Sequence, residues 1–151
     1  MKIIDFDLSL RIPFTDSFNE GCITDVSGGS KRISMKAQGQ GSDSWRYTAP
    51  EVISRKNFDG FAIDLWSAGI ILYIMLVGTF PFESAQRVDR NFVQYSVEGA
   101  LEEILRENFS TMSKEASNLL QNMLWENPAK RLSLLQIMEH PWVLNDVTES
   151  N

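Results

Sequence analysis

A long apolar stretch, residues 65–77, constrains the fold of this chain more than any other feature, because it contains no charged side chain. A helix that is apolar on every side is either buried in protein or placed in a membrane. A membrane-spanning helix needs about 20 apolar residues, and this stretch is shorter and contains Ser67, Gly69 and Tyr73. The sequence therefore predicts a helix buried on all sides, and no membrane segment.

Helical patterning covers most of the chain on either side of this stretch. We expect helices at 49–55, 63–77, 98–107, 114–124 and 134–139. Asp64 and Ser113 precede two of these helices and have the side-chain oxygen that N-caps use. Ser133 with Gln136 fits the S-x-x-Q capping box. Pro141 is expected to end the last helix, because proline cannot continue one.

The N-terminal part of the chain has a different character. Residues 2–10 are apolar and β-prone apart from Asp5 and Asp7, which predicts a short strand and a turn. Residues 14–44 are rich in Ser, Gly, Asp, Asn and Lys without a sustained apolar period, which predicts a long loop. A loop of this length within a domain is usually functional or disordered.

Composition narrows the classes of function. The net charge of −6 argues against non-specific nucleic-acid binding, which needs a cationic surface. Hydrophobic content of 43% and charged content of 23% are ordinary for a single globular domain. Cys22 is the one cysteine, so no intramolecular disulfide forms, which fits a reducing compartment. We therefore expect a cytoplasmic or nuclear protein.

Several short motifs follow one another along the chain. They are Asp5-Phe6-Asp7, the Y-T-A-P-E of residues 47–51, the D-L-W-S-A-G of residues 64–69, the N-P-A-K-R-L of residues 127–132 and the H-P-W of residues 140–142. In this order they resemble the large lobe of the eukaryotic protein kinase family. Their C-terminal end resembles the calcium/calmodulin-dependent kinase group most.

The resemblance implies a mainly α fold, a kinase-like C-terminal lobe. It would be a helical bundle with a short N-terminal β segment and a long activation loop. The activation segment would cover 5–51, the helical subdomain 52–143 and a short tail 144–151. The 151 residues contain no Gly-rich loop, no V-A-I-K lysine and no H-R-D-L-x-x-x-N motif. The small lobe and the catalytic loop are therefore absent from this sequence.

The resemblance assigns Asp5 as a metal ligand, because the family's D-F-G aspartate holds Mg²⁺ on the ATP phosphates. The alternative is that Asp5 only ends a strand. Phe6 would pack in the hydrophobic spine of the kinase. Asp7 stands where the family has glycine, and aspartate has less backbone freedom than glycine. This change indicates either an altered activation switch or a degenerate kinase.

Besides Phe6, four residues receive structural roles. By resemblance, Glu51 and Arg131 form a buried salt bridge that fixes the substrate loop to the helical core; the alternative is two unpaired surface charges. Asp64 is expected to cap its own helix, since the catalytic loop that it contacts in the family is absent. Trp66 is expected beneath the substrate loop, which is compatible with a plain core aromatic.

The substrate-docking segment is expected at Ser44, Trp45, Arg46, Tyr47 and Thr48. The hydroxyl at Ser44 and the ring of Tyr47 favour serine/threonine over tyrosine specificity. Asp43 stands where the family has glycine. Possible phosphosites in and near the long loop are Ser30, Ser34, Ser42 and Ser44. An insertion with incidental serines is the alternative.

The sequence thus predicts a serine/threonine protein kinase that transfers phosphate from ATP, with Mg²⁺, to protein substrates. The chain by itself is expected to be inactive, because the catalytic aspartate, the phosphate-binding lysine and one metal ligand are missing. Three explanations remain: one part of a longer enzyme, a pseudokinase-like binding module, or a regulatory fragment that competes for substrates. The coding sequence upstream of Met1 distinguishes the first from the others.

Overall fold

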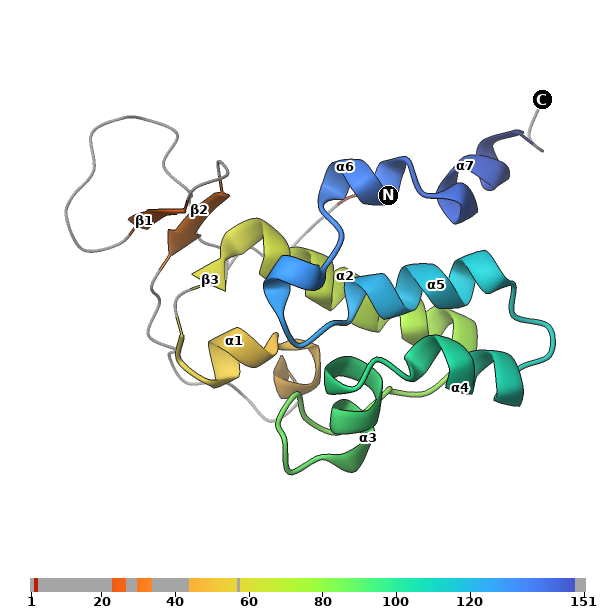
Figure 1. Ribbon diagram of the computed structural model, residues 1–151, viewed down its shortest axis with the longest axis horizontal. Coiled ribbons are helices and arrows are strands. Elements are labelled where there is room, and N and C mark those ends of the chain that lie inside the picture. Colours follow the sequence, from red (N-terminus) through yellow and green to blue (C-terminus); the bar gives the residue numbers. More distant parts are fainter. Residues whose placement is uncertain (1, 3–22, 27–29, 34–43, 57, 149–151) are drawn as a thin grey trace.

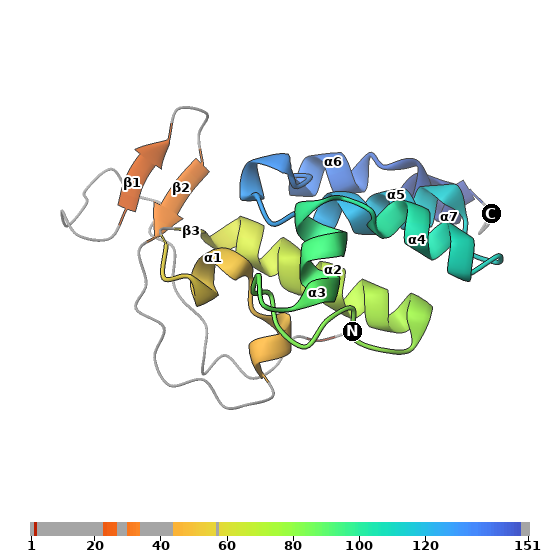
Figure 2. The same ribbon diagram turned by 60° about the horizontal axis from the view of Figure 1, so that its bottom comes forward.

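The computed structural model describes residues 2, 23–26, 30–33, 44–56 and 58–148. Over these ranges the chain is mainly helical with one small sheet, as Figures 1 and 2 show. The predicted strand within 2–10 and the metal candidate Asp5 lie outside the described residues. So do Phe6, Asp7 and Cys22.

A three-stranded antiparallel sheet stands at one side of the helices (Figure 1). It consists of β1 (Ile23–Val26), β2 (Ser30–Ile33) and β3 (Phe58–Asp59). Strand β2 lies between the other two and pairs Ile23 with Ile33 on one side and Asp59 with Arg32 on the other. The expectation of loop throughout residues 14–44 was therefore wrong. Three β-branched residues of four in β1 favour a strand over this short span.

Most of the remaining chain forms helices. They are α1 (Pro50–Ile53), α2 (Gly60–Val77), α3 (Arg90–Phe92), α4 (Leu101–Asn108), α5 (Lys114–Met123), α6 (Leu134–Met138) and α7 (Pro141–Thr148), with short 3₁₀ turns η1 (Ser44–Tyr47) and η3 (Pro128–Lys130) and a π-helical turn η2 (Val93–Val97). Helix α2 runs beside α5, with α3 and α4 on one side and α6 and α7 on the other (Figure 1).

Helix α2 begins earlier than predicted. Its N-cap is Asp59, whose carboxylate accepts a hydrogen bond from the backbone N–H of Phe61 at 2.8 Å. Asp64 lies one turn inside the helix, so the prediction that it caps the helix was wrong. Gly78 ends α2 in the left-handed conformation, with φ of 87°.

The buried face of α2 is a single stripe. Trp66, Gly69, Ile70 and Tyr73 are its buried residues, at the spacing of one helical face. At Gly69 an added Cβ would lie 3.0 Å from Leu124 Cδ2. The absence of a side chain there lets α2 approach α5 closely.

The opposite face of α2 is exposed, so the prediction of burial on all sides was wrong. The exposed apolar residues are Phe61, Ile71, Met75 and Leu76, and Met75 is 76% exposed. With 18 residues and a mean hydropathy of 1.9, α2 is long and apolar enough to cross a membrane by length and composition alone. Its other face packs on α5, and 28% of the helix is buried inside the structure. Length and composition alone do not distinguish a membrane span from a helix of a protein core.

Helices α5 and α6 begin where their capping serines predict. Ser113 Oγ accepts from the backbone N–H of Ala116 at 3.1 Å. Ser133 and Gln136 form the predicted capping box. Pro141 follows α6 but also begins α7, which extends to Thr148. The expected tail of residues 144–151 therefore starts as helix, because proline is well suited to the first turn of a helix.

Candidate functional site

The predicted substrate-docking segment lies on the N-terminal half of α2. Residues 44–47 form the turn η1, closed by a hydrogen bond from the backbone N–H of Thr48 to the carbonyl of Trp45 at 3.2 Å. Ser67 Oγ of α2 donates to the carbonyl oxygen of Tyr47 at 3.0 Å. Ala49 is buried and leads into α1. The backbone of this segment is therefore held on the helical body.

Glu51 and Arg131 join the end of this segment to the distant C-terminal part of the chain. Arg131 Nη1 and Nη2 donate to Glu51 Oε1 and Oε2, each at 2.7 Å. Both side chains are buried. The ion pair expected from the motifs is thus formed, and its bidentate geometry is the strong form of an arginine–carboxylate contact.

Arg131 also satisfies its other donors. Its Nε donates to the carbonyl of Trp125 at 2.8 Å, and its two Nη atoms donate further to the carbonyls of Ala62 at 3.3 Å and Glu126 at 3.2 Å. The guanidinium carbon lies 4.7 Å from the centre of the Trp66 ring. All five N–H groups of a guanidinium are therefore used, and one cation joins α1, α2 and the turn after α5.

Trp66 is a core aromatic rather than a surface contact. It is fully buried and its ring packs beside Phe82 and Phe92, with ring centres 5.9 and 6.4 Å apart. Among the described residues its Nε1 has no hydrogen-bond partner. Its contact with Arg131 places it beneath the ion pair at the end of the predicted substrate segment.

The loop that follows α2 supplies a second set of contacts. Arg46 Nη2 donates to the carboxylate of Glu83, and the Arg46 guanidinium carbon lies 4.9 Å from the centre of the Phe80 ring. The ring of Tyr47 meets Phe80 edge-on, with centres 5.4 Å apart. Sequence reasoning missed Phe80 and Glu83. The only signal was that their loop follows α2 directly.

Asp64 lies on the exposed face of α2, one turn from Phe61. Partial desolvation raises the pKa of its carboxyl above the ordinary 3.8. Within the part of the chain that the structure describes, no hydrogen bond to this carboxylate is found.

Some predicted site residues are not described. Asp5, Phe6, Ser34 and Ser42 lie outside the described ranges, while Ser30 and Ser44 are described only through the backbone of β2 and η1. In residues 44–56 and 58–148, no three His, Cys, Asp or Glu residues gather as metal ligands. The structure therefore gives no ligand set for Mg²⁺, and the assignment of Asp5 stays a prediction.

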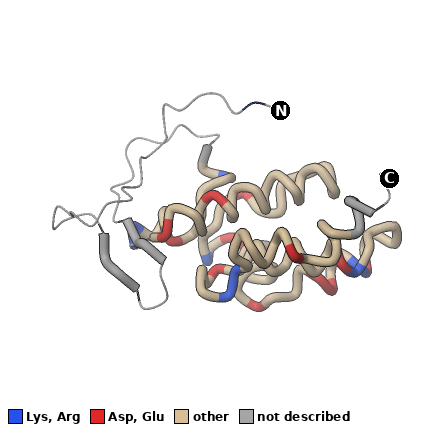
Figure 3. Tube along the Cα trace, turned by 90° about the horizontal axis from the view of Figure 1, so that it is seen from above, with Lys and Arg blue, Asp and Glu red and all other residues tan. Residues whose placement is uncertain are grey.

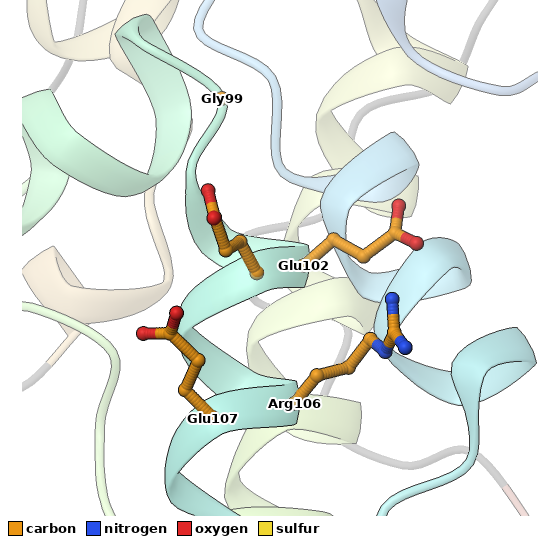
Figure 4. A pocket seen from close by; sticks show the side chains of 5 residues that line it. Gly99, Glu102, Arg106 and Glu107 are labelled. Atoms are coloured by element: carbon orange, nitrogen blue, oxygen red, sulfur yellow. The ribbon is translucent and has the colours of Figure 1, made fainter.

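A shallow pocket lies elsewhere, along α4 (Figure 4). It is lined by Gly99, Glu102, Glu103, Arg106 and Glu107. In Figure 4 the side chains of Glu102 and Arg106 lie on one side of the helix and that of Glu107 on the other. Neither the predicted substrate segment nor the ion pair at its end contributes to the pocket. Basic residues are otherwise scattered along the described helices rather than gathered in one patch (Figure 3).

Comparison with known proteins gives the family. The sequence pattern described as protein kinase domain matches residues 1–143. Serine/threonine-protein kinase SAPK2 of Oryza sativa subsp. indica is 37% identical over 101 residues, which cover 67% of this chain and 30% of that protein. Serine/threonine-protein kinase SRK2A of Physcomitrium patens is 38% identical over 110 residues, which cover 67% of this chain and 29% of that protein.

A calcium-dependent kinase is also among the relatives. Calcium-dependent protein kinase 21 of Oryza sativa subsp. japonica is 36% identical over 151 residues, which cover 100% of this chain and 22% of that protein. The chain thus spans less than a third of the length of these three relatives. The motifs, the ion pair and these similarities lead to one conclusion: the chain belongs to the protein kinase family, and at family level to its serine/threonine kinases.

Proposed function

We propose that this chain is the part of a serine/threonine protein kinase domain that docks the protein substrate. The observation that supports this most is the set of contacts made by Arg46, Tyr47 and Glu51, in and just after residues 44–48. Ser67 holds the backbone of the segment on α2, and Arg46 holds it on the loop after α2. The buried pair of Glu51 and Arg131 anchors the residues that follow. A segment held in this way can present a peptide in one orientation.

In the complete domain, the γ-phosphoryl group of ATP passes to a serine or threonine hydroxyl of a protein. In such reactions, Mg²⁺ neutralises negative charge on the phosphates when it is bound. We assign Asp5 as its ligand, with Phe6 packing behind it. The proposed limits are 5–51 for the activation segment, 52–143 for the helical subdomain and 144–151 for the tail.

Regulation and surroundings follow from the same proposal. Phosphate added at Ser30, Ser34, Ser42 or Ser44 brings negative charge that orders a loop when an arginine can receive it. The proposed setting is cytoplasmic or nuclear, with ATP and protein substrates as partners, and with neither nucleic acid nor membrane. Phosphopeptide mapping that finds these serines only unmodified removes the regulatory part.

A chimeric enzyme tests the proposal directly. The 151 residues replace the matching region of calcium-dependent protein kinase 21, and transfer of labelled phosphate to serine and tyrosine peptides is measured. We expect transfer to serine that is lost in Asp5→Asn, because the metal then lacks a carboxylate ligand. A folded chimera that binds ATP but transfers nothing, or transfers equally well with Asp5→Asn, contradicts the proposal.

The 151-residue chain alone is proposed to be inactive. Positioning and electrostatic stabilisation provide nearly all of the catalysis in phosphoryl transfer, and this sequence contains neither the H-R-D motif nor the phosphate-binding lysine. Incubation of the purified chain with labelled ATP and protein substrates tests this. Transfer above that of a heat-denatured control overturns it.

A second function is favoured by the exposed face of α2. The chain would then act as a pseudokinase-like binding or regulatory module without catalysis. Ile71 and Met75, one turn apart, are exposed apolar residues there, and contiguous apolar surface marks binding sites. Ile71→Lys with Met75→Lys should abolish capture of a partner in the cell while the chain stays folded. If the chimera is active and the double lysine variant still captures the partner, catalysis remains the proposed function.

A further inference from the structure

The predicted substrate-docking segment, residues 44–48, has one charged side chain, Arg46. Its two partners both come from the loop after α2. The carboxylate of Glu83 accepts from Nη2, and the ring of Phe80 lies 4.9 Å from the guanidinium carbon. An arginine over an aromatic face is held by the charge distribution of the ring as well as by its ion pair. Arg46 is thus oriented from two sides.

The side chains of Arg46 and Glu83 differ in how far they are exposed to solvent. The side chain of Arg46 is 41% exposed, and that of Glu83 is 77% exposed. Glu83 therefore lies almost free in solvent, whereas Arg46 is half covered by its neighbours. An ion pair this exposed is weak, so the carboxylate of Glu83 can leave without disturbing the fold.

The backbones on both sides of the pair are fixed. Next to Arg46, the carbonyl of Tyr47 accepts from Ser67 Oγ at 3.0 Å. Asp89 Oδ2 accepts from the N–H groups of Glu83 at 2.8 Å and Ser84 at 3.1 Å. Asp89 Oδ1 accepts from the N–H of Phe92 at 3.1 Å. Both carboxylate oxygens of Asp89 are therefore bonded to the backbone of this loop and the start of α3. Replacement of Glu83 at Arg46 by another group therefore needs only rotation of the Glu83 side chain.

These contacts indicate which charge a group must have to replace Glu83 at Arg46. A basic group would have to compete with Arg46 for the carboxylate of Glu83, whereas an acidic group has only to displace the exposed Glu83 side chain from an Arg46 that already lies over the Phe80 ring. The contact with Glu83 occupies one nitrogen of a guanidinium that has five N–H donors and suits bidentate carboxylate binding. The site is therefore arranged for an incoming carboxylate.

We propose that Arg46 binds a glutamate or aspartate carboxylate of the protein substrate, and that Glu83 occupies Arg46 until the substrate replaces it. The inference rests on the proposed function and names its substrate class. The substrates are proteins with acidic residues close to the accepting serine or threonine.

Solution NMR of the ¹⁵N-labelled 151-residue chain tests the proposal. Three capped octapeptides share a central serine and differ only in their flanking residues, which are glutamate, glutamine or lysine. The Arg46 Nε–H signal, assigned by its loss in Arg46→Lys, reports on each titration at low salt. We expect the glutamate peptide to shift this signal. Its affinity should be at least about five times that of the lysine peptide.

Matched variants separate the roles of the two residues. Glu83→Gln removes the competing charge and should strengthen binding of the glutamate peptide, while Arg46→Gln should abolish the preference. Arg106→Gln, an exposed arginine on α4, should leave the preference unchanged. Circular dichroism establishes that each variant is folded.

The outcomes distinguish this inference from the proposed function. Equal binding of all three peptides at residues 44–48, or preference for lysine, overturns the inference and leaves the substrate-docking role in place. Binding of none of them overturns both. Weaker binding of the glutamate peptide by Glu83→Gln also overturns the inference, because Glu83 would then support the substrate rather than compete with it.

Discussion

Glu51 and Arg131, 80 residues apart in the chain, form a buried bidentate ion pair with both N···O distances at 2.7 Å. The pair joins α1, which follows the predicted substrate segment, to the turn after α5. Removing one partner of a buried pair leaves an uncompensated charge, which is much more costly than losing a surface contact. The ion pair makes the position of residues 44–48 dependent on the C-terminal part of the fold.

Arg131→Met should lower the free energy of unfolding by about 3–5 kcal/mol, because the Glu51 carboxylate stays buried without its cation. Glu51→Gln should have an effect in the same direction. Urea unfolding followed by tryptophan fluorescence measures both. The double variant should be more stable than the sum of the single effects predicts, since it leaves no unpaired charge.

Arg87→Met provides the matched control. Arg87 pairs with Glu126 in the same bidentate manner, at 2.7 and 3.0 Å, but on the surface. Solvent screens such a pair, so urea unfolding should show no change beyond measurement error. If Arg87→Met and Arg131→Met lower stability equally, burial is not what makes the pair of Glu51 and Arg131 important.

Two adjacent isoleucines test the one-sided burial of α2. Ile70 is 0% exposed and Ile71 is 50% exposed. Ile70→Ala should lower the free energy of unfolding by about 2–5 kcal/mol, because it leaves a cavity in the hydrophobic core. Ile71→Ala should cost less than about 1 kcal/mol. Similar losses in urea unfolding would mean that the exposed face of α2 is covered by the same chain in solution.

Alanine variants of two glycines with positive φ distinguish the cost of backbone strain from the cost of steric overlap. Gly78 has φ of 87° and open space around it, so Gly78→Ala should cost about 1–2 kcal/mol from the left-handed conformation alone. Gly99 has φ of 80°, and an added Cβ would lie 2.2 Å from Cη2 of Trp125. Gly99→Ala should therefore cost about 1–3 kcal/mol more than Gly78→Ala.

Thermal and urea unfolding of the two alanine variants check this order. A shift in the tryptophan emission of Gly99→Ala alone is expected, since the new methyl group displaces the Trp125 ring. Equal destabilisation of both variants would show that Trp125 moves aside freely.

The sequence predicted the helices whose signals are local. Helix α5 was expected at 114–124 and is found at Lys114–Met123, because Ser113 is a good cap and the apolar spacing is regular. Strands β1 and β2 were missed because each has only four residues. The start of α2 was placed too late, because both Asp59 and Asp64 are good caps and composition does not choose between them.

The candidate site was predicted unevenly. The pair of Glu51 and Arg131 followed from motif resemblance, since no local pattern relates residues so far apart. One-sided burial of α2 was missed because an apolar sequence does not specify how many of its faces find a partner. The partners of Arg46 were missed for another reason. Glu83 lies 37 residues away on an irregular loop, which periodicity does not describe.

Asp64 gives a prediction about pH. Partial desolvation raises the pKa of its carboxyl in the folded chain above the ordinary 3.8. The folded state therefore binds the proton more tightly than the unfolded state, and the free energy of unfolding falls as the pH rises between the two pKa values. Asp64→Asn removes this loss, so the variant should be more stable than the parent at neutral pH.

The stability difference between Asp64→Asn and the parent should shrink as the pH falls through the raised pKa and should vanish below the ordinary 3.8. Urea unfolding of both proteins at several pH values measures it, and Glu103→Gln, at an exposed position on α4, controls for the general effect of removing one negative charge. A variant less stable than the parent at neutral pH would contradict the argument. It would mean that the Asp64 carboxylate makes a favourable contact in solution that outweighs its desolvation.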